Sequence, residues 1–122
     1  YTILEENDIR AKLIPRNDFA HKGTMGQALI IAGSYGMAGA AVLATRACLR
    51  SGAGKVVVHT PKRNYDIMQT AVPEAVMQID HEETYFSEPV NVEDFDSLGI
   101  GPGLGQQENT AIAMISQIRR TQ

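Results

Sequence analysis

The pattern of apolar and polar positions predicts an alternation of strands and helices. Residues 27–32 read Q-A-L-I-I-A, a segment that is continuously apolar from Ala28 and ends at Gly33, which is typical of a strand buried on both faces of a parallel sheet. Residues 38–50 are rich in alanine at helical spacing, and Gly52 is placed to end that helix. The β-branched run at 55–59 predicts a second strand. Together these segments predict a βαβ unit.

The rest of the chain continues this alternation. Residues 5–13 predict a short helix with a packing role that ends before Pro15. The further expected elements are a helix at 64–71, a strand at 74–79, an irregular acidic segment at 80–96, a strand at 97–100 and a helix at 108–120. We therefore expect an α/β fold, a mostly parallel sheet with helices on both faces. Because a final helix normally packs on a strand that follows it, we expect residues 1–122 to be the N-terminal portion of a single domain.

Composition and charge exclude several classes of protein. Hydrophobic residues make up 43% of the chain and charged residues 20%, which is typical of a globular protein. The formal net charge is -3 and the basic residues are scattered, so we expect no nucleic-acid partner. The apolar runs are too short to span a membrane, and the first residues lack the pattern of a signal peptide, so we expect a cytoplasmic protein. Cys48 is the only cysteine, and its apolar neighbours predict a buried packing residue rather than a nucleophile.

Two glycine-rich segments follow predicted strands and precede predicted helices. The first, residues 33–41, reads G-S-Y-G-M-A-G-A-A, and the second, residues 101–105, reads G-P-G-L-G. Loops at the carboxyl ends of parallel strands are where open α/β sheets bind ligands, and glycine lets the backbone approach a ligand closely. If the two strands are neighbours, both loops flank one cleft, and a phosphorylated or nucleotide-like ligand is the natural hypothesis.

The spacing of the first glycine loop does not support two common motifs, and it leaves one other reading of the loop open. Its glycines do not follow G-x-G-x-x-G and the chain has no G-x-x-x-x-G-K-[ST], so neither a Rossmann dinucleotide site nor a P-loop is supported. Gly39, Ala40 and Ala41 could instead be small only to let the helix pack tightly on the sheet. Ser34 could add a hydroxyl contact to a ligand.

Other polar residues point less clearly to function. Lys22 and Thr24 lie before the first strand, where they could reach a phosphate or be solvated. We expect His21, His59 and His81 to be structural or solvated, because no metal or nucleophile motif surrounds them. The acidic segment at 80–96 is interpreted as a solvated loop rather than a metal site.

Several blocks of sequence resemble the ADP/ATP-dependent NAD(P)H-hydrate dehydratases. These blocks are H-K-G-T-M-G at 21–26, A-G-S at 32–34, M-A-G-A-A at 37–41, R-S-G-A-G at 50–54, P-E at 73–74 and G-I-G-P-G-L-G at 99–105. The resemblance implies a ribokinase-like fold and an enzyme that uses ADP or ATP with Mg²⁺ to remove water from hydrated NADH or NADPH. It also implies that Gly39, Ala40, Gly101 and Gly103 face the substrate, and that the enzyme forms a homo-oligomer.

The resemblance also implies what these residues lack. In that family the catalytic aspartate belongs to a later G-T-G-D type motif, and no G-x-G-D follows residue 105 here. Asp94 and Asp96 precede the second glycine loop and do not match that motif. We therefore expect residues 1–122 to carry part of a substrate pocket, no catalytic residue and no metal ligand. A ribokinase-like kinase of a sugar or vitamin precursor, or a non-catalytic module that self-associates, remain alternatives.

Overall fold

The protein is a three-layer α/β structure, seen in a computed structural model that describes residues 1–13, 15 and 25–121. The sheet that these described residues form has four strands in the order β3-β2-β1-β4. The strands are β1 (Gln27–Ile31), β2 (Lys55–Thr60), β3 (Val76–Ile79) and β4 (Ser97–Ile100). All three pairings are parallel, which confirms the predicted parallel sheet.

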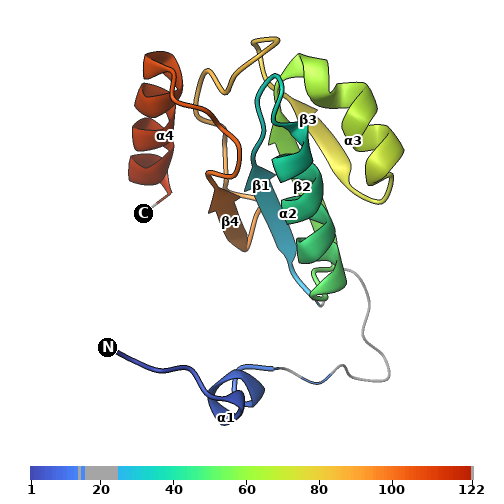
Figure 1. The fold of residues 1–122 in the computed structure, drawn as a ribbon, viewed down its shortest axis with the longest axis vertical. Helices are drawn as coiled ribbons and strands as arrows, with labels where there is room; N and C mark the ends of the chain where they lie inside the picture. The colour runs from blue at the N-terminus through green and yellow to red at the C-terminus, as the bar shows by residue number, and fades with distance from the viewer. Residues whose placement is uncertain (14, 16–24, 122) are drawn as a thin grey trace.

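Helices cover both faces of this sheet (Figure 1). The helices α2 (Ala38–Arg50) and α3 (Tyr65–Ala71) pack on one face, and α4 (Glu108–Arg120) packs on the other. Successive side chains of a strand point to opposite faces, and β1 serves both layers in this way: Ile30 belongs to one core cluster, while Leu29 and Ile31 belong to the other. Its continuous apolar run is therefore explained by burial on both sides.

The predicted boundaries hold closely for the elements that flank the glycine loops. The bounds of α2, β4 and α4 are those expected, and β1 is one residue shorter than predicted. A 3-10 turn, η1 (Lys62–Asn64), precedes α3. Strand β3 begins two residues later than predicted, because the Ala75 N–H donates to the Val72 carbonyl in a turn instead of joining the sheet.

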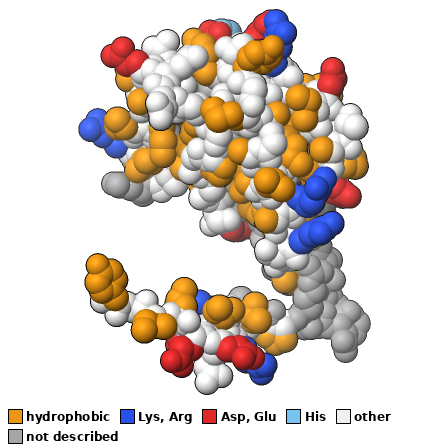
Figure 2. Space-filling view, in the orientation of Figure 1, with side chains coloured by type: hydrophobic (Ala, Val, Ile, Leu, Met, Phe, Trp, Pro, Cys, Tyr) orange, Lys and Arg blue, Asp and Glu red, His pale blue; other side chains and the backbone are white. Residues whose placement is uncertain are grey.

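The N-terminal helix differs most from expectation. Helix α1 (Glu6–Arg10) is shorter than predicted, because the bonds that follow it are the tighter type from residue i to i−3, as from Lys12 N to the Ile9 carbonyl. No residue of α1 is buried, so the predicted packing role is not seen in this chain. The apolar side chains of this segment lie on the surface (Figure 2).

Helix α4 packs through small and polar side chains. Its buried residues are Thr110, Ala113 and Gln117. The Gln117 amide accepts a hydrogen bond from Val90 N at 2.7 Å and donates to the Val90 carbonyl at 3.2 Å, so it ties the helix to the segment before β4. Three isoleucines that recur along one side of this helix are exposed by 44–60%: Ile112, Ile115 and Ile118. One side of α4 is therefore an exposed apolar face.

Candidate functional site

The first glycine loop is shaped by close packing at its start. Gly33 has φ +85°, a backbone conformation that side chains rarely tolerate. A Cβ at this position would also lie 2.9 Å from Asn64 Nδ2 and 3.1 Å from the Ala41 Cβ. Gly33 is therefore required by the fold, and the loop that it opens turns directly into α2.

The second glycine loop touches the start of α2. Gly103 has φ +66°, and a Cβ on it would lie 2.7 Å from the Ala40 Cβ and 3.0 Å from the Met37 carbonyl oxygen. Only glycine allows the two segments to approach this closely. The loop thus lies against the first one, although the two are far apart in sequence.

Hydrogen bonds join the two loops. Ser34 Oγ donates to the Gly103 carbonyl at 2.8 Å, and the Gly33 N–H donates to the Pro102 carbonyl at 2.8 Å. Strands β1 and β4 are neighbours, as the cleft hypothesis required. The chain passes from β1 to β2 and β3 on one side and to β4 on the other, so the strand order reverses between the two loops. Such a switch point is where open α/β sheets place their ligand crevice.

The four residues predicted to face a substrate all lie at this junction, but in two different environments. A Cβ added to Gly39 or Gly101 would meet no atom within 4 Å, so both positions border open space. Ala40 and Gly103 instead contact each other. Packing thus explains why Ala40 and Gly103 are small, but it does not explain Gly39. Contact between any of these four residues and a substrate stays a prediction.

Ser34 has a structural role in this loop. Its side chain is 6% exposed, and its hydroxyl proton is directed at the Gly103 carbonyl. The ligand contact suggested for this hydroxyl therefore has to use an oxygen lone pair. Other predicted contacts to phosphate, from Lys22 and Thr24, lie outside the described residues, as does His21.

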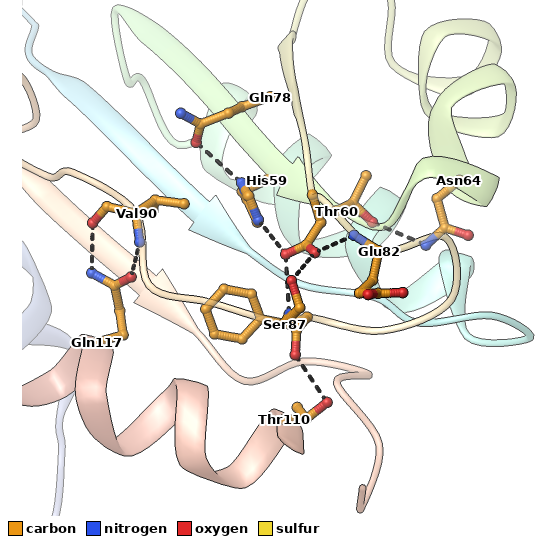
Figure 3. Close-up of polar contacts among 11 residues, drawn as sticks. His59, Thr60, Asn64, Gln78, Glu82, Ser87, Val90, Thr110 and Gln117 are labelled. Carbon is orange, nitrogen blue, oxygen red and sulfur yellow. Dashed lines mark hydrogen bonds and ion pairs between the residues drawn. The ribbon is translucent and has the colours of Figure 1, made fainter. Parts of the chain in front are cut away.

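The segment between β3 and β4 corrects the expectation of a solvated acidic loop. It is irregular, as predicted, but Asp80 is 1% exposed and Phe86 is also 1% exposed. His59 Nε2 lies 2.7 Å from Asp80 Oδ2, and His59 Nδ1 lies 3.2 Å from the Gln78 amide oxygen (Figure 3). The Ser87 hydroxyl donates to Asp80 Oδ1. His59 is thus a buried structural residue, as expected, while His81 is exposed.

The pKa of Asp80 is lowered by these contacts. Burial on its own would raise the pKa, because it disfavours the charged carboxylate. Hydrogen bonds from the side chains of His59 and Ser87 and from the N–H groups of Glu82 and Ser87 outweigh it. This cluster holds the segment onto the carboxyl ends of β2 and β3.

Neither Cys48 nor the later acidic residues form a reactive site. Cys48 belongs to α2 and packs against the core between this helix and the sheet. Burial raises the pKa of its thiol, which disfavours the thiolate. Asp96 Oδ2 accepts a hydrogen bond from Gln27 N at 2.7 Å, so it caps the first strand. Across residues 1–13, 15 and 25–121, no three His, Cys, Asp or Glu side chains are grouped to hold a metal ion. No helix in the same residues is long and apolar enough to cross a membrane.

Comparison with known proteins identifies the family. Residues 28–122 match the family described as NAD(P)H-hydrate dehydratase. The chain belongs to the NAD(P)H-hydrate dehydratase family. An ADP-dependent (S)-NAD(P)H-hydrate dehydratase of Listeria monocytogenes is 45% identical over 91 residues, which are 74% of this chain and 32% of that protein. The bifunctional NAD(P)H-hydrate repair enzyme Nnr of Escherichia coli is 45% identical over 96 residues, which are 79% of this chain and 18% of that protein.

Solved structures show that this family member has a ribokinase-like fold. The ADP/ATP-dependent NAD(P)H-hydrate dehydratase of Bacillus subtilis, co-crystallised with ATP/Mg²⁺, superposes with a TM-score of 0.77 at 35% identity and is covered over 40% of its chain. A ribokinase-like superfamily protein of Enterococcus faecalis superposes with a TM-score of 0.81 at 26% identity, over 98% of this chain and 41% of that one. The chain thus spans about a third to two fifths of the length of these single-function relatives.

Proposed function

We propose that the protein carrying these residues is an ADP- or ATP-dependent dehydratase that restores NADH and NADPH from their hydrated forms. Residues 1–122 would supply part of the substrate pocket through Gly39, Ala40, Gly101 and Gly103. The observation that supports this most is the meeting of the two glycine loops at the switch point between β1 and β4. The family match favours a dehydratase over a sugar or vitamin-precursor kinase.

The two loops would act by binding and orienting the substrate. Gly39 and Gly101 leave open space beside the backbone, so a ligand can approach the main chain there without a steric clash. The bonds from Ser34 and Gly33 to the second loop fix the two walls relative to each other before a ligand arrives. Such preorganisation lowers the entropic cost of binding.

The nucleotide and the metal ion are inferred from relatives. The Listeria monocytogenes protein is named as ADP-dependent, and the Bacillus subtilis protein was co-crystallised with ATP/Mg²⁺. We infer that ADP or ATP, with Mg²⁺, serves this protein too. The part of the chain that the structure describes offers no group of ligands for Mg²⁺, so none of its residues is assigned a role toward that ion.

The test is an assay of dehydration with hydrated NADH and hydrated NADPH, followed by the return of the reduced nicotinamide absorbance. The full natural protein is expected to need ADP or ATP for turnover. Residues 1–122 alone are expected to give none, since their sequence has no G-T-G-D motif. Turnover by residues 1–122 alone would contradict this division of roles. Phosphorylation of a sugar or vitamin precursor without dehydration would favour the kinase alternative.

Self-association is a second property that the structure supports as a proposal. Ile118, one of the exposed isoleucines of α4, lines an apolar groove of about 450 Å³ that is bordered by β4, and β4 is an outer strand of the sheet that the structure describes. Exposed apolar faces and strand edges favour association. Size-exclusion chromatography of residues 1–122 should show an oligomer. A monomer would argue against the alternative of a non-catalytic module that self-associates.

A further inference from the structure

A groove of about 520 Å³ opens beside the first glycine loop. Tyr35, Gly36 and Gly39 line one wall, and Arg63 and Ile67 line the other. A Cβ added to Gly36 or Gly39 would meet no atom within 4 Å, so both glycines leave this space open. Because Gly39 also belongs to the proposed substrate pocket, the groove continues that pocket toward α3.

Arg63 gives the groove a positive charge. It is the one charged side chain among the described residues that line the groove. Its guanidinium carbon lies 5.7 Å from the centroid of the Tyr35 ring, which is the range of a cation–π contact. This contact orients the planar guanidinium, whose paired N–H groups match the oxygens of a phosphate.

The present partner of Arg63 is easily exchanged. Arg63 Nε lies 3.5 Å from Glu83 Oε2, and the two side chains are 58% and 64% exposed. Exposed ion pairs of this length contribute little to stability. An anionic ligand in the groove can therefore take the guanidinium from Glu83 at small cost.

We propose that this groove binds a phosphate group of the nicotinamide dinucleotide substrate, with Arg63 as the anion-binding residue and Tyr35 as the residue that positions it. The identity of the ligand rests on the proposed function. Hydrated NADH carries a pyrophosphate, and hydrated NADPH carries in addition a phosphate on its ribose, so both contain the required chemistry. Glu83 competes with the ligand for Arg63.

The experiment compares Arg63→Met with Lys62→Met in the full natural protein. Both variants remove one positive charge from adjacent exposed positions, but Lys62 does not line the groove. Dissociation constants are measured by calorimetry for hydrated NADH, hydrated NADPH, ADP and inorganic pyrophosphate. Arg63→Met should weaken binding of the dinucleotides about tenfold. Lys62→Met should leave it unchanged, and Glu83→Gln should tighten it about twofold to threefold. Melting temperatures verify that each variant is folded.

The outcomes separate the possible ligands. An equal loss for both dinucleotides assigns the groove to the pyrophosphate, and a loss for hydrated NADPH alone assigns it to the ribose phosphate. Unchanged dinucleotide binding in Arg63→Met overturns the proposal, as does an effect confined to ADP. The function is tested separately, by turnover of the unmodified protein. If turnover fails while Arg63-dependent binding of pyrophosphate persists, the proposed function falls and the anion site stands.

Discussion

The Ser34 hydroxyl donates a hydrogen bond of 2.8 Å to the Gly103 carbonyl, and these two residues are 69 positions apart in the sequence. The bond joins the loop after β1 to the loop after β4, at the place where the strand order reverses. Because Ser34 is 6% exposed, water cannot easily replace it as the partner of that carbonyl. The two walls of the proposed substrate pocket are therefore held together by a buried side chain rather than by the ligand.

Replacing Ser34 by alanine should weaken both the fold and substrate binding. The Ser34→Ala variant leaves the Gly103 carbonyl without its donor, and the expected loss of stability is about 1 kcal/mol. The apparent Michaelis constant for the hydrated dinucleotide should rise, because the two loops are less fixed. The control is Ser51→Ala, which removes an exposed hydrogen bond to the Ala47 carbonyl at the end of α2. An equal rise for both variants would show that Ser34 has no special part in the pocket.

Adding bulk at Gly39 should block binding without unfolding the protein. Gly39 is the second residue of α2, and a Cβ there would meet open space, so a Gly39→Leu side chain can extend into the proposed pocket. Leucine also favours a helix more than glycine does, by about 0.8 kcal/mol. We expect an unchanged or higher melting temperature together with a large loss of substrate affinity. Ala47→Leu is the matched control, because it adds bulk to an exposed position of α2 about two turns further on. Normal substrate affinity in Gly39→Leu would remove Gly39 from the site.

The local pattern of the sequence predicted the elements that build the glycine-loop junction. Gly33 follows a run buried on both faces, and the bounds of α2 and α4 agree with helical spacing and glycine or loop residues at their ends. The sequence did not predict that β1 and β4 are neighbours. The hypothesis of one cleft between the two loops only required it. Strand order depends on which strands pair across long separations, and such pairing leaves little trace in local spacing.

The buried cluster at His59 shows what local spacing does not reveal. His59 lies opposite Gln78 in the register of β2 and β3, and Asp80 follows Gln78 by two positions along the same edge. On an extended chain, residues two positions apart point to the same face. Asp80 therefore lies on the face of Gln78 and contacts the His59 ring. Asp80 is the first residue of the acidic segment, which the sequence predicts to be a solvated loop. Only the pairing of the two strands distinguishes it from its neighbours.

The stability of the chain should depend on the charge of Asp80. Its pKa is lowered in the folded state, so the carboxylate stabilises the fold above the unfolded pKa of about 3.9, and this contribution is lost as the pH falls through the lower folded value. Asp80→Asn should reduce the free energy of unfolding at neutral pH by about 1–3 kcal/mol, because the amide NH2 that replaces one carboxylate oxygen cannot accept the buried hydrogen bonds that this oxygen receives. Urea unfolding between neutral and acid pH measures both effects. The gap between Asp80→Asn and the unmodified protein should narrow in acid.

Asp94→Asn provides the control for this pH series. Asp94 is exposed, and its replacement should change stability by less than about 0.5 kcal/mol. A constant gap between Asp80→Asn and the unmodified protein at every pH would mean that the Asp80 pKa is not lowered.

Two buried threonines should respond in opposite directions to the same substitution. Thr45 on α2 is 0% exposed, and within the described part of the chain its Oγ1 is the one buried side-chain oxygen or nitrogen without a hydrogen-bond partner. Thr45→Val removes this unsatisfied hydroxyl at nearly constant shape, so we expect the free energy of unfolding to rise by about 1 kcal/mol. Thr110 on α4 is 2% exposed, but its Oγ1 donates to the Phe86 carbonyl at 3.1 Å. Thr110→Val breaks that bond and should lower the free energy of unfolding by about 1 kcal/mol or more. Urea unfolding of both variants measures the two changes, and a loss of stability in Thr45→Val would indicate that a bound water satisfies its hydroxyl.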